Sequence, residues 1–176
     1  VLEVHAQVLE KRKLDKELAQ HPDLFNAEEH GSLIDYSELV VGKVLGQGAQ
    51  GTVRQAMWKD EEVAVKIMTL DTQSLIEDGG AAEQLEEVKT EALALNRLEH
   101  PNIIKFYGVS FKNTEVNLCL CIILQLCSRS LNDEIDDKDV TLTWSQKLRY
   151  LLDVAQGMQH MHSVGVYHRD LKPANV

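Results

Sequence analysis

The sequence predicts an α+β fold, with a strand-rich first part and a helical second part. Five short strand-like segments surround one amphipathic helix, and a long helix with a capping signal follows them. The chain has 176 residues, of which 44% are hydrophobic and 26% are charged. These fractions are typical of a globular protein, and the length is enough for a packed core.

Three strands are expected first, in quick succession. The alternation of apolar residues predicts strands at residues 39–45, 52–58 and 63–68. Gly46–Gly51 is expected to form the turn between the first two, and Lys59–Asp60 the turn between the next two. The strands should therefore form a meander of neighbouring hairpins.

A helix is expected over residues 81–98, after a polar loop at 71–80. Its apolar residues recur at spacings of three and four, which places them on one face. They are Leu85, Val88, Ala92 and Leu95. The sequence His100-Pro101-Asn102 is expected to end the helix.

Two more strands are predicted at residues 103–109 and 118–124, with a polar turn at 112–115 between them. The second strand is apolar on both faces, which is typical of a central, buried strand. Three cysteines lie in it or beside it: Cys119, Cys121 and Cys127. Their spacing lacks the four-ligand layout of a zinc site, so we interpret them as reduced structural thiols.

The second part is expected to contain a short helix near residues 131–135 and then a long one. Thr143 is predicted to begin the long helix, because Gln146 three residues later completes a capping box. Its apolar face is expected to consist of Leu148, Leu151, Leu152, Ala155, Met158 and Met161.

The net charge of −10 disfavours a nucleic-acid-binding function, since such modules usually carry a basic face. The longest apolar run, residues 118–124, is too short to span a bilayer. We identify no secretory signal and expect a cytoplasmic protein. Residues 1–32 are interpreted as a helical extension or linker; a docking segment that binds a partner is the alternative. The chain begins without Met and stops within a motif, so we expect a fragment.

Residues 46–53, GQGAQGTV, fit the pattern G-x-G-x-x-G-x-V. Glycine-rich hairpins are common, so the context decides the interpretation. A dinucleotide-binding motif would lead into a helix, whereas the strand pattern here continues to Trp58. A Walker A loop would need Lys where Thr52 follows Gly51. In a glycine-rich hairpin, backbone amides can approach phosphate groups closely.

Lys66 ends the apolar segment Val63-Ala64-Val65-Lys66. A lysine whose stem lies along the sheet and whose head reaches water is the ordinary explanation. The functional explanation needs a carboxylate partner, and Glu91 is the candidate because it shares a helix face with Val88 and Leu95. Glu91 alone would be read as a surface charge.

Residues 168–176, HRDLKPANV, fit the pattern H-R-D-x-x-x-x-N. In that pattern an Asp positions the attacking hydroxyl and an Asn holds a metal ion. A surface loop with a turn proline is the alternative. His168 is interpreted as a packed structural residue, and Arg169 either as a ligand for a phosphorylated loop or as a brace.

Four motifs occur in this order: GQGAQGTV at 46–53, VAVK at 63–66, Glu91 ahead of LEHPNI at 98–103, and HRDLKPAN at 168–175. Together they resemble the amino-terminal part of a eukaryotic-type protein kinase domain over residues 36–176. The resemblance implies a two-lobed fold with a complete five-stranded antiparallel N-lobe and one helix, and only the first part of the helical C-lobe. It divides the chain into an extension at 1–32, the N-lobe and hinge at 33–127, and the C-lobe start at 128–176. Lys172 resembles serine/threonine kinases, and Trp58 with the IDYSEL segment resembles the tyrosine-kinase-like group.

The resemblance also implies roles for individual residues, with ATP and Mg²⁺ as cofactors and a protein as substrate. Lys66 would hold the α- and β-phosphates and pair with Glu91. Asp170 would orient the substrate hydroxyl, Lys172 would contact the transferred phosphate, and Asn175 would bind Mg²⁺. The nucleotide would be contacted by Leu45, Gly46, Gln47, Gly48, Gly51, Val53, Ala64, Lys66, Leu124, Gln125 and Cys127.

The family's D-F-G segment and activation loop are not in this sequence. We therefore expect an active parent kinase, an inactive isolated piece, and a helix at 143–162 with an uncovered apolar face. A pseudokinase that binds nucleotide as a scaffold is the main alternative, and a metabolite kinase is the third.

Overall fold

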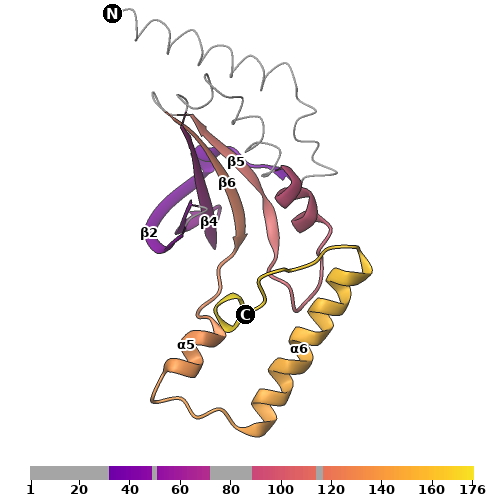
Figure 1. Ribbon diagram of the computed structural model, residues 1–176. Coiled ribbons are helices and arrows are strands. Elements are labelled where there is room, and N and C mark those ends of the chain that lie inside the picture. Colours follow the sequence, from indigo (N-terminus) through magenta and orange to yellow (C-terminus); the bar gives the residue numbers. More distant parts are fainter. Residues whose placement is uncertain (1–31, 49–50, 72–88, 114–116) are drawn as a thin grey trace, which may run out of the picture.

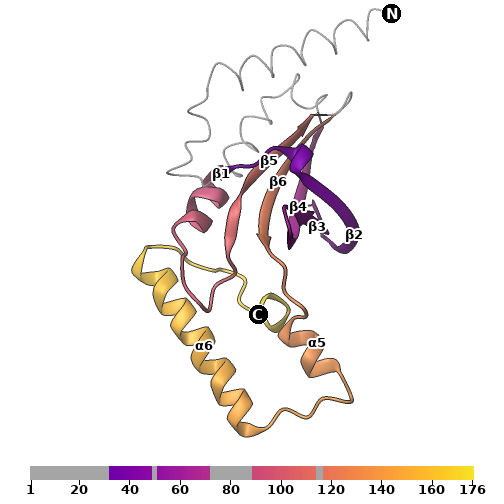
Figure 2. The same ribbon diagram turned by 180° about the vertical axis from the view of Figure 1, so that it is seen from behind.

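The computed structural model describes residues 32–48, 51–71, 89–113 and 117–176. A twisted sheet and one helix form one part of the molecule, and two helices lie below them (Figures 1 and 2). This arrangement confirms the predicted α+β fold. Several predictions lie outside the described residues. They are the N-terminal helix and linker, the polar loop from 72 to 80, the tip of the glycine turn, and residues 81–88, which are the first part of the helix predicted at 81–98.

The sheet has six strands in the order β1-β5-β6-β4-β3-β2. The strands are β1 Ser32–Leu33, β2 Leu39–Gly48, β3 Gly51–Trp58, β4 Glu61–Asp71, β5 Phe106–Asn113 and β6 Asn117–Gln125. Strands β2 to β6 pair antiparallel, as predicted. The two-residue strand β1 was not predicted, and it pairs with β5 in parallel. The most apolar strand, β6, is central, so the interpretation of its two apolar faces is confirmed.

Several predicted strand boundaries were wrong, and β5 ends at Asn113 rather than at Val109. β2 and β3 stay paired to Gly48 and Gly51, so most of the predicted glycine turn belongs to the strands. β4 extends to Asp71. β5 begins at Phe106 rather than at Ile103, whose N–H donates to His100 O at 3.0 Å within a turn. An apolar residue in a packed turn gives the same pattern as one in a strand, so composition did not locate this boundary.

The described part of the first helix covers residues 89–96. It ends two residues earlier than predicted, because Arg97 and Leu98 N–H donate to carbonyls three residues back and tighten the last turn. Below the sheet lie α5, Leu131–Asp136, and α6, Trp144–Ser163. The predicted capping box of Thr143 and Gln146 is present at the start of α6.

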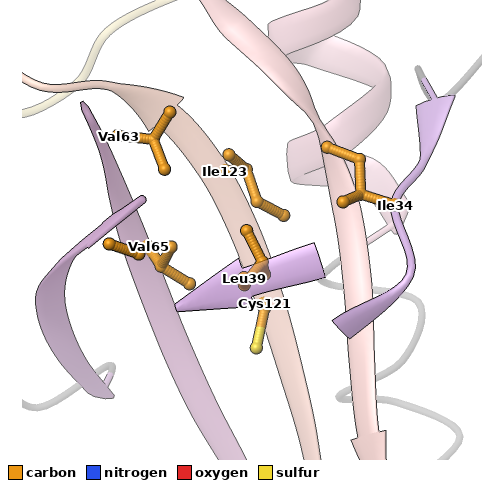
Figure 3. Close-up of a cluster of buried hydrophobic side chains, with 7 residues drawn as sticks. Ile34, Leu39, Val63, Val65, Cys121 and Ile123 are labelled. Carbon is orange, nitrogen blue, oxygen red and sulfur yellow. The ribbon is translucent and has the colours of Figure 1, made fainter. Parts of the chain in front are cut away.

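One face of the sheet carries a compact apolar core, shown in Figure 3. It consists of Ile34, Leu39, Ala56, Val63, Val65, Cys121 and Ile123, all buried. Burying a Val, Leu or Ile side chain contributes about 1.5–3 kcal/mol before entropy is subtracted. Ile34 comes from the segment before β2, and Leu39 is the first residue of β2. The start of the described chain therefore covers what we call the outer face of the sheet. Ile34 N–H donates to Val109 O at 2.8 Å and ties the segment to β5.

Aromatic side chains extend the same core. Trp58 and Tyr107 meet edge to face, with ring centroids 5.6 Å apart, and Trp58 Nε1 donates to Glu38 at 3.1 Å. The Tyr107 hydroxyl donates to Glu61. Burial and, second, this carboxylate raise the pKa of Tyr107 to about 12. Polar atoms on these rings are thus paired where the apolar bodies are packed.

The apolar face of α6 is largely uncovered within the described residues. Trp144, Leu148, Leu151 and Leu152 are between 57% and 79% exposed, while Met161 at the other end is buried. The prediction of an uncovered apolar face is confirmed for the first half of this helix. None of the helices in the described part is long and apolar enough to cross a membrane.

Candidate functional site

The sheet register places four of the predicted nucleotide residues on one face of the sheet. Val53 pairs with Lys66, and Ala64 pairs with Leu124. Directly paired residues point to the same face, and residues two apart on one strand do as well. Val53, Ala64, Lys66 and Leu124 therefore share a face opposite the outer core, which we call the inner face.

The glycine hairpin forms one end of this face, and its glycines fall into two groups. Gly51 has a φ of +125° and lies directly against the Ile67 carbonyl, so a Cβ would collide with β4 backbone. Added Cβ atoms at Gly46 and Gly48 would meet nothing within 4 Å. These two glycines and Gln47 are exposed, which leaves their backbone open to a ligand. Leu45 precedes them and is 44% exposed.

Lys66 and Glu91 form the predicted ion pair. Lys66 Nζ donates to Glu91 Oε1 at 2.8 Å and to Oε2 at 3.0 Å. The side chains are 18% and 39% exposed, so the carboxylate is less buried than the sequence suggested. The contact also places the helix at 89–96 on the inner face. A lysine held in this way presents its charge at a defined position beside the glycine hairpin.

The end of β6 begins the predicted hinge. Gln125 N–H donates to Lys105 O at 2.8 Å, and Lys105 N–H donates to Gln125 Oε1 at 3.3 Å. The Gln125 N–H is thus occupied, and any adenine contact at this residue falls to its carbonyl. Cys127, two residues on, is exposed and free.

A cavity in the described part lies beside the predicted nucleotide residues rather than over them. Its volume is about 610 Å³, and Gln125 alone of the predicted nucleotide residues lines it. The other lining residues come from the end of the helix at 89–96, the following turn and the start of β5.

The loop at 168–176 brings the predicted catalytic residues together. Lys172 Nζ lies 2.8 Å from Asp170 Oδ2, and Asn175 Nδ2 donates to the same oxygen at 3.0 Å. Asn175 Nδ2 also donates to Asp170 O at 2.8 Å. Three residues that the motif separates along the chain therefore converge on one carboxylate.

This environment holds Asp170 in its ionised form. The hydrogen bond from Lys172 is the main cause that lowers the pKa of Asp170. Desolvation opposes it, and the bond from Asn175 and nearby positive charge lower the pKa further. Both side-chain partners use Oδ2, so Oδ1 has no partner among the described residues. Asp170 can therefore accept a hydrogen bond from a hydroxyl at neutral pH.

Backbone geometry supports this loop. Arg169 has a φ of +61°, in the left-handed region that non-glycine residues rarely occupy. Asp170 N–H donates to His168 O at 2.8 Å and lies 3.3 Å from His168 Nδ1. Leu131 N–H donates to Val176 O at 2.7 Å, and both views show the loop ending beside α5. The segment after the hinge is thus bonded to the end of the loop.

The residues present are compatible with a phosphate-bound Mg²⁺ rather than with a protein cage for a metal ion. Among the described residues, no group of three His, Cys, Asp or Glu side chains could hold a metal ion. Mg²⁺ usually takes one or two protein oxygens together with phosphate and water. Asn175 uses its nitrogen toward Asp170, which leaves its Oδ1 for such a role.

Sequence reasoning missed the residues that join the two parts of the molecule. Asn102 Nδ2 donates to Asp153 O at 3.1 Å and to Gln156 Oε1 at 3.0 Å, which connects the turn before β5 to α6. A Cβ on Gly157 would come within 3.0 Å of Asn102 O, so glycine permits this close approach. A buried glycine inside a helix pattern was the available signal.

Comparison with known proteins agrees with this geometry. The profile of the protein kinase domain family matches residues 39–176. A probable serine/threonine-protein kinase of Dictyostelium discoideum is 33% identical over 143 residues, which cover 81% of this chain and 8% of that protein. The probable serine/threonine-protein kinase gdt4 of the same organism is 33% identical over 166 residues, 92% of this chain and 9% of the relative.

A third probable serine/threonine-protein kinase of Dictyostelium discoideum is 33% identical over 177 residues, 98% of this chain and 27% of the relative. The chain thus spans less than a third of the length of each of these three relatives. The profile covers 138 residues, from 39 to 176, which is most of the 176 in the chain. The chain therefore belongs to the protein kinase domain family.

Proposed function

We propose that the protein carrying this chain is an ATP-dependent serine/threonine kinase that transfers the γ-phosphate to protein hydroxyl groups. The observation that carries this proposal is the two-bond pair of Lys66 and Glu91 on the inner face. This pair holds a cation beside the glycine hairpin, where phosphates would lie. The domain layout of extension, N-lobe with hinge, and C-lobe start is part of the proposal.

The chain's own residues would act mainly by positioning. Lys66 would bind the α- and β-phosphates, while backbone groups of the glycine hairpin would cover them. The face of Val53, Ala64 and Leu124 would enclose the adenine ring, with Leu45 above it and the hinge backbone along its edge. ATP and Mg²⁺ supply the transferred group and neutralise its charge when they are bound.

At the loop, the free oxygen of Asp170 would orient the substrate hydroxyl and take up its proton. As that hydroxyl oxygen bonds to the γ-phosphorus, the bond from this phosphorus to the β–γ bridging oxygen would break and ADP would leave. The hydroxyl proton would move to Asp170 Oδ1 late in the transfer. Lys172 would contact the moving phosphate while it holds Oδ2. Asn175 would offer its amide oxygen to Mg²⁺. The low pKa of Asp170 keeps it an acceptor throughout the physiological pH range.

Location and partners remain proposals as well. We propose a cytoplasmic protein, because ATP-dependent phosphotransfer and free thiols such as Cys127 both suit a reducing, ATP-rich compartment. A protein substrate follows from the proposed reaction. A partner that binds the predicted N-terminal helix of residues 1–32 is also part of the proposal.

The test is phosphotransfer by the full-length protein with Mg²⁺ and labelled ATP, followed by phosphoamino-acid analysis. We expect phosphoserine and phosphothreonine, and we expect turnover to fall by about 10²–10⁴ in Asp170→Asn with ATP affinity retained. Asp139→Asn, an exposed Asp in the turn before α6, is the matched control and should keep full activity. Wild-type protein that binds Mg²⁺ and ATP without any turnover would contradict the proposal and favour a pseudokinase.

A further inference from the structure

Arg54 makes a contact that none of the motifs accounts for. Its guanidinium donates twice to the carbonyl oxygen of Gly42, from Nε at 3.0 Å and from Nη2 at 2.8 Å. Arg54 lies on β3 and Gly42 on β2, so the contact joins the two strands of the glycine hairpin near its base. Hydrogen bonds from a charged donor are shorter and stronger than neutral ones.

The carbonyl of Gly42 is available because β2 is irregular at this point. Val41 pairs with Ala56 and Val44 pairs with Arg54. Between these two pairs β2 has one more residue than β3, which is a β-bulge in β2. A second shift follows between Val44 and Gly46. Each extra residue leaves backbone groups outside the ladder and bends the strand. The carbonyl of Gly42 is one of these groups, and the guanidinium of Arg54 donates to it.

Gly42 contributes to the same arrangement. A Cβ added at this residue would lie 3.3 Å from Gln55 O, which is tighter than ordinary van der Waals contact. Glycine therefore lets the bulged strand stay close to β3, within reach of the guanidinium. The bulge, the glycine and the arginine form one local device, which we call the hairpin clamp.

The clamp lies away from the inner face. Arg54 pairs with Val44 on one side and with the buried Val65 on the other, so its side chain is on the outer face. Val53, the next residue back, pairs with Lys66 and points to the inner face. Arg54 therefore cannot touch a nucleotide bound beside Lys66 and would act only through the hairpin backbone.

We propose that Arg54 is a positioning residue for nucleotide binding, an inference that rests on the proposed kinase function. It holds the bulged base of the hairpin, so that residues 44–48 and 51–53 keep their curvature over the phosphates. All of β2 beyond Val41 is exposed and receives little support from the core. A strand held in its binding conformation loses less conformational freedom when the ligand arrives.

The kinetic test uses the full-length protein with a fixed protein substrate. We expect Arg54→Met to raise KM for ATP about three- to tenfold, where tenfold corresponds to about 1.4 kcal/mol, with kcat changed less than about twofold. Arg54→Lys should restore part of the loss, because an ammonium can donate to the carbonyl without the planar fork. Lys59→Met removes an exposed charge at the turn between β3 and β4, outside the clamp, and should leave KM unchanged.

A second measurement does not depend on turnover. Hydrogen–deuterium exchange should be faster for backbone amides at 43–53 in Arg54→Met than in wild type, with exchange in β4 and β6 unchanged. Faster exchange with an unaltered KM would overturn the positioning role, and so would an equal rise of KM in Lys59→Met. If wild type shows no turnover, the proposed function fails and the nucleotide role falls with it. Unchanged exchange rates would overturn the clamp itself.

Discussion

Two lysine–carboxylate pairs of equal length differ in almost everything else. Lys66–Glu91 and Lys172–Asp170 each have an N···O distance of 2.8 Å. The first joins residues 25 apart in the chain, with side chains 18% and 39% exposed. The second joins residues two apart, with side chains 52% and 65% exposed. The first pair depends on a helix packed against a sheet, whereas the second needs only the local path of one loop.

Because the two pairs differ in burial and in separation along the chain, they contribute differently to the protein. An exposed pair is screened by salt and contributes little to folding stability. A half-buried pair across two elements breaks when those elements move apart, and it then leaves a lysine beside an apolar face. Lys66–Glu91 therefore reports whether the N-lobe is assembled. Lys172–Asp170 instead sets the charge and orientation of one carboxylate.

The largest expected effect comes from removing the long-range cation. In the full-length protein, Lys66→Met should lower kcat/KM for ATP by about 10²–10³, the typical cost of losing one preorganised charged donor in an active site. Lys59→Met, at the exposed turn between β3 and β4, should change it less than about twofold as a charge-matched control. Steady-state kinetics at varied ATP measure both. Equal losses in the two variants would show that only net charge matters.

Coupling energies should then distinguish the two pairs directly. A double-mutant cycle with Lys66→Met and Glu91→Gln should give a coupling of about 1 kcal/mol in the free energy of unfolding, as for contacting residues. The corresponding cycle with Lys172→Met and Asp170→Asn should give no resolvable coupling, because both side chains are exposed. Denaturant unfolding provides the measurement. A larger coupling for the loop pair would reverse the comparison.

The smallest effect is a titration. The pKa of Asp170 should lie below its ordinary value of 3.8, because Lys172 and Asn175 stabilise the carboxylate. A depressed carboxyl pKa stabilises the folded state above the ordinary value, and this contribution is lost only as the pH falls through the folded pKa. Lys172→Met should move the pKa upward. Carboxyl ¹³C chemical shifts against pH measure it, and a midpoint at or above 3.8 in wild type would contradict the structure.

Local sequence signals located most elements correctly. The capping box of Thr143 and Gln146 predicted the start of α6 because both hydrogen bonds form within four residues. The central position of β6 followed from its unbroken apolar run. The loop at 168–176 could be recognised from its motif, and the side-chain contacts among Asp170, Lys172 and Asn175 join residues close in the chain. Interactions of short range leave their pattern in the sequence.

Contacts across the fold were harder to anticipate. β1 is two residues long and leaves no periodic pattern, so its pairing with β5 was invisible. The hairpin clamp depends on a register shift in β2, the strand next to Arg54, and no residue type in the sequence indicates such a shift. Glu91 was singled out from several glutamates only through resemblance and helix spacing, since any of them could have been a solvated charge.

The sequence by itself determined the order of strands and helices, the capped helix and the composition of the loop, because spacing and local hydrogen bonding encode these features. Only the tertiary structure decided that Val53, Ala64, Lys66 and Leu124 share one face, and that Glu91 reaches Lys66. Strand register and helix docking are set by burial across segments distant in the chain. A pattern read along the chain does not contain that information.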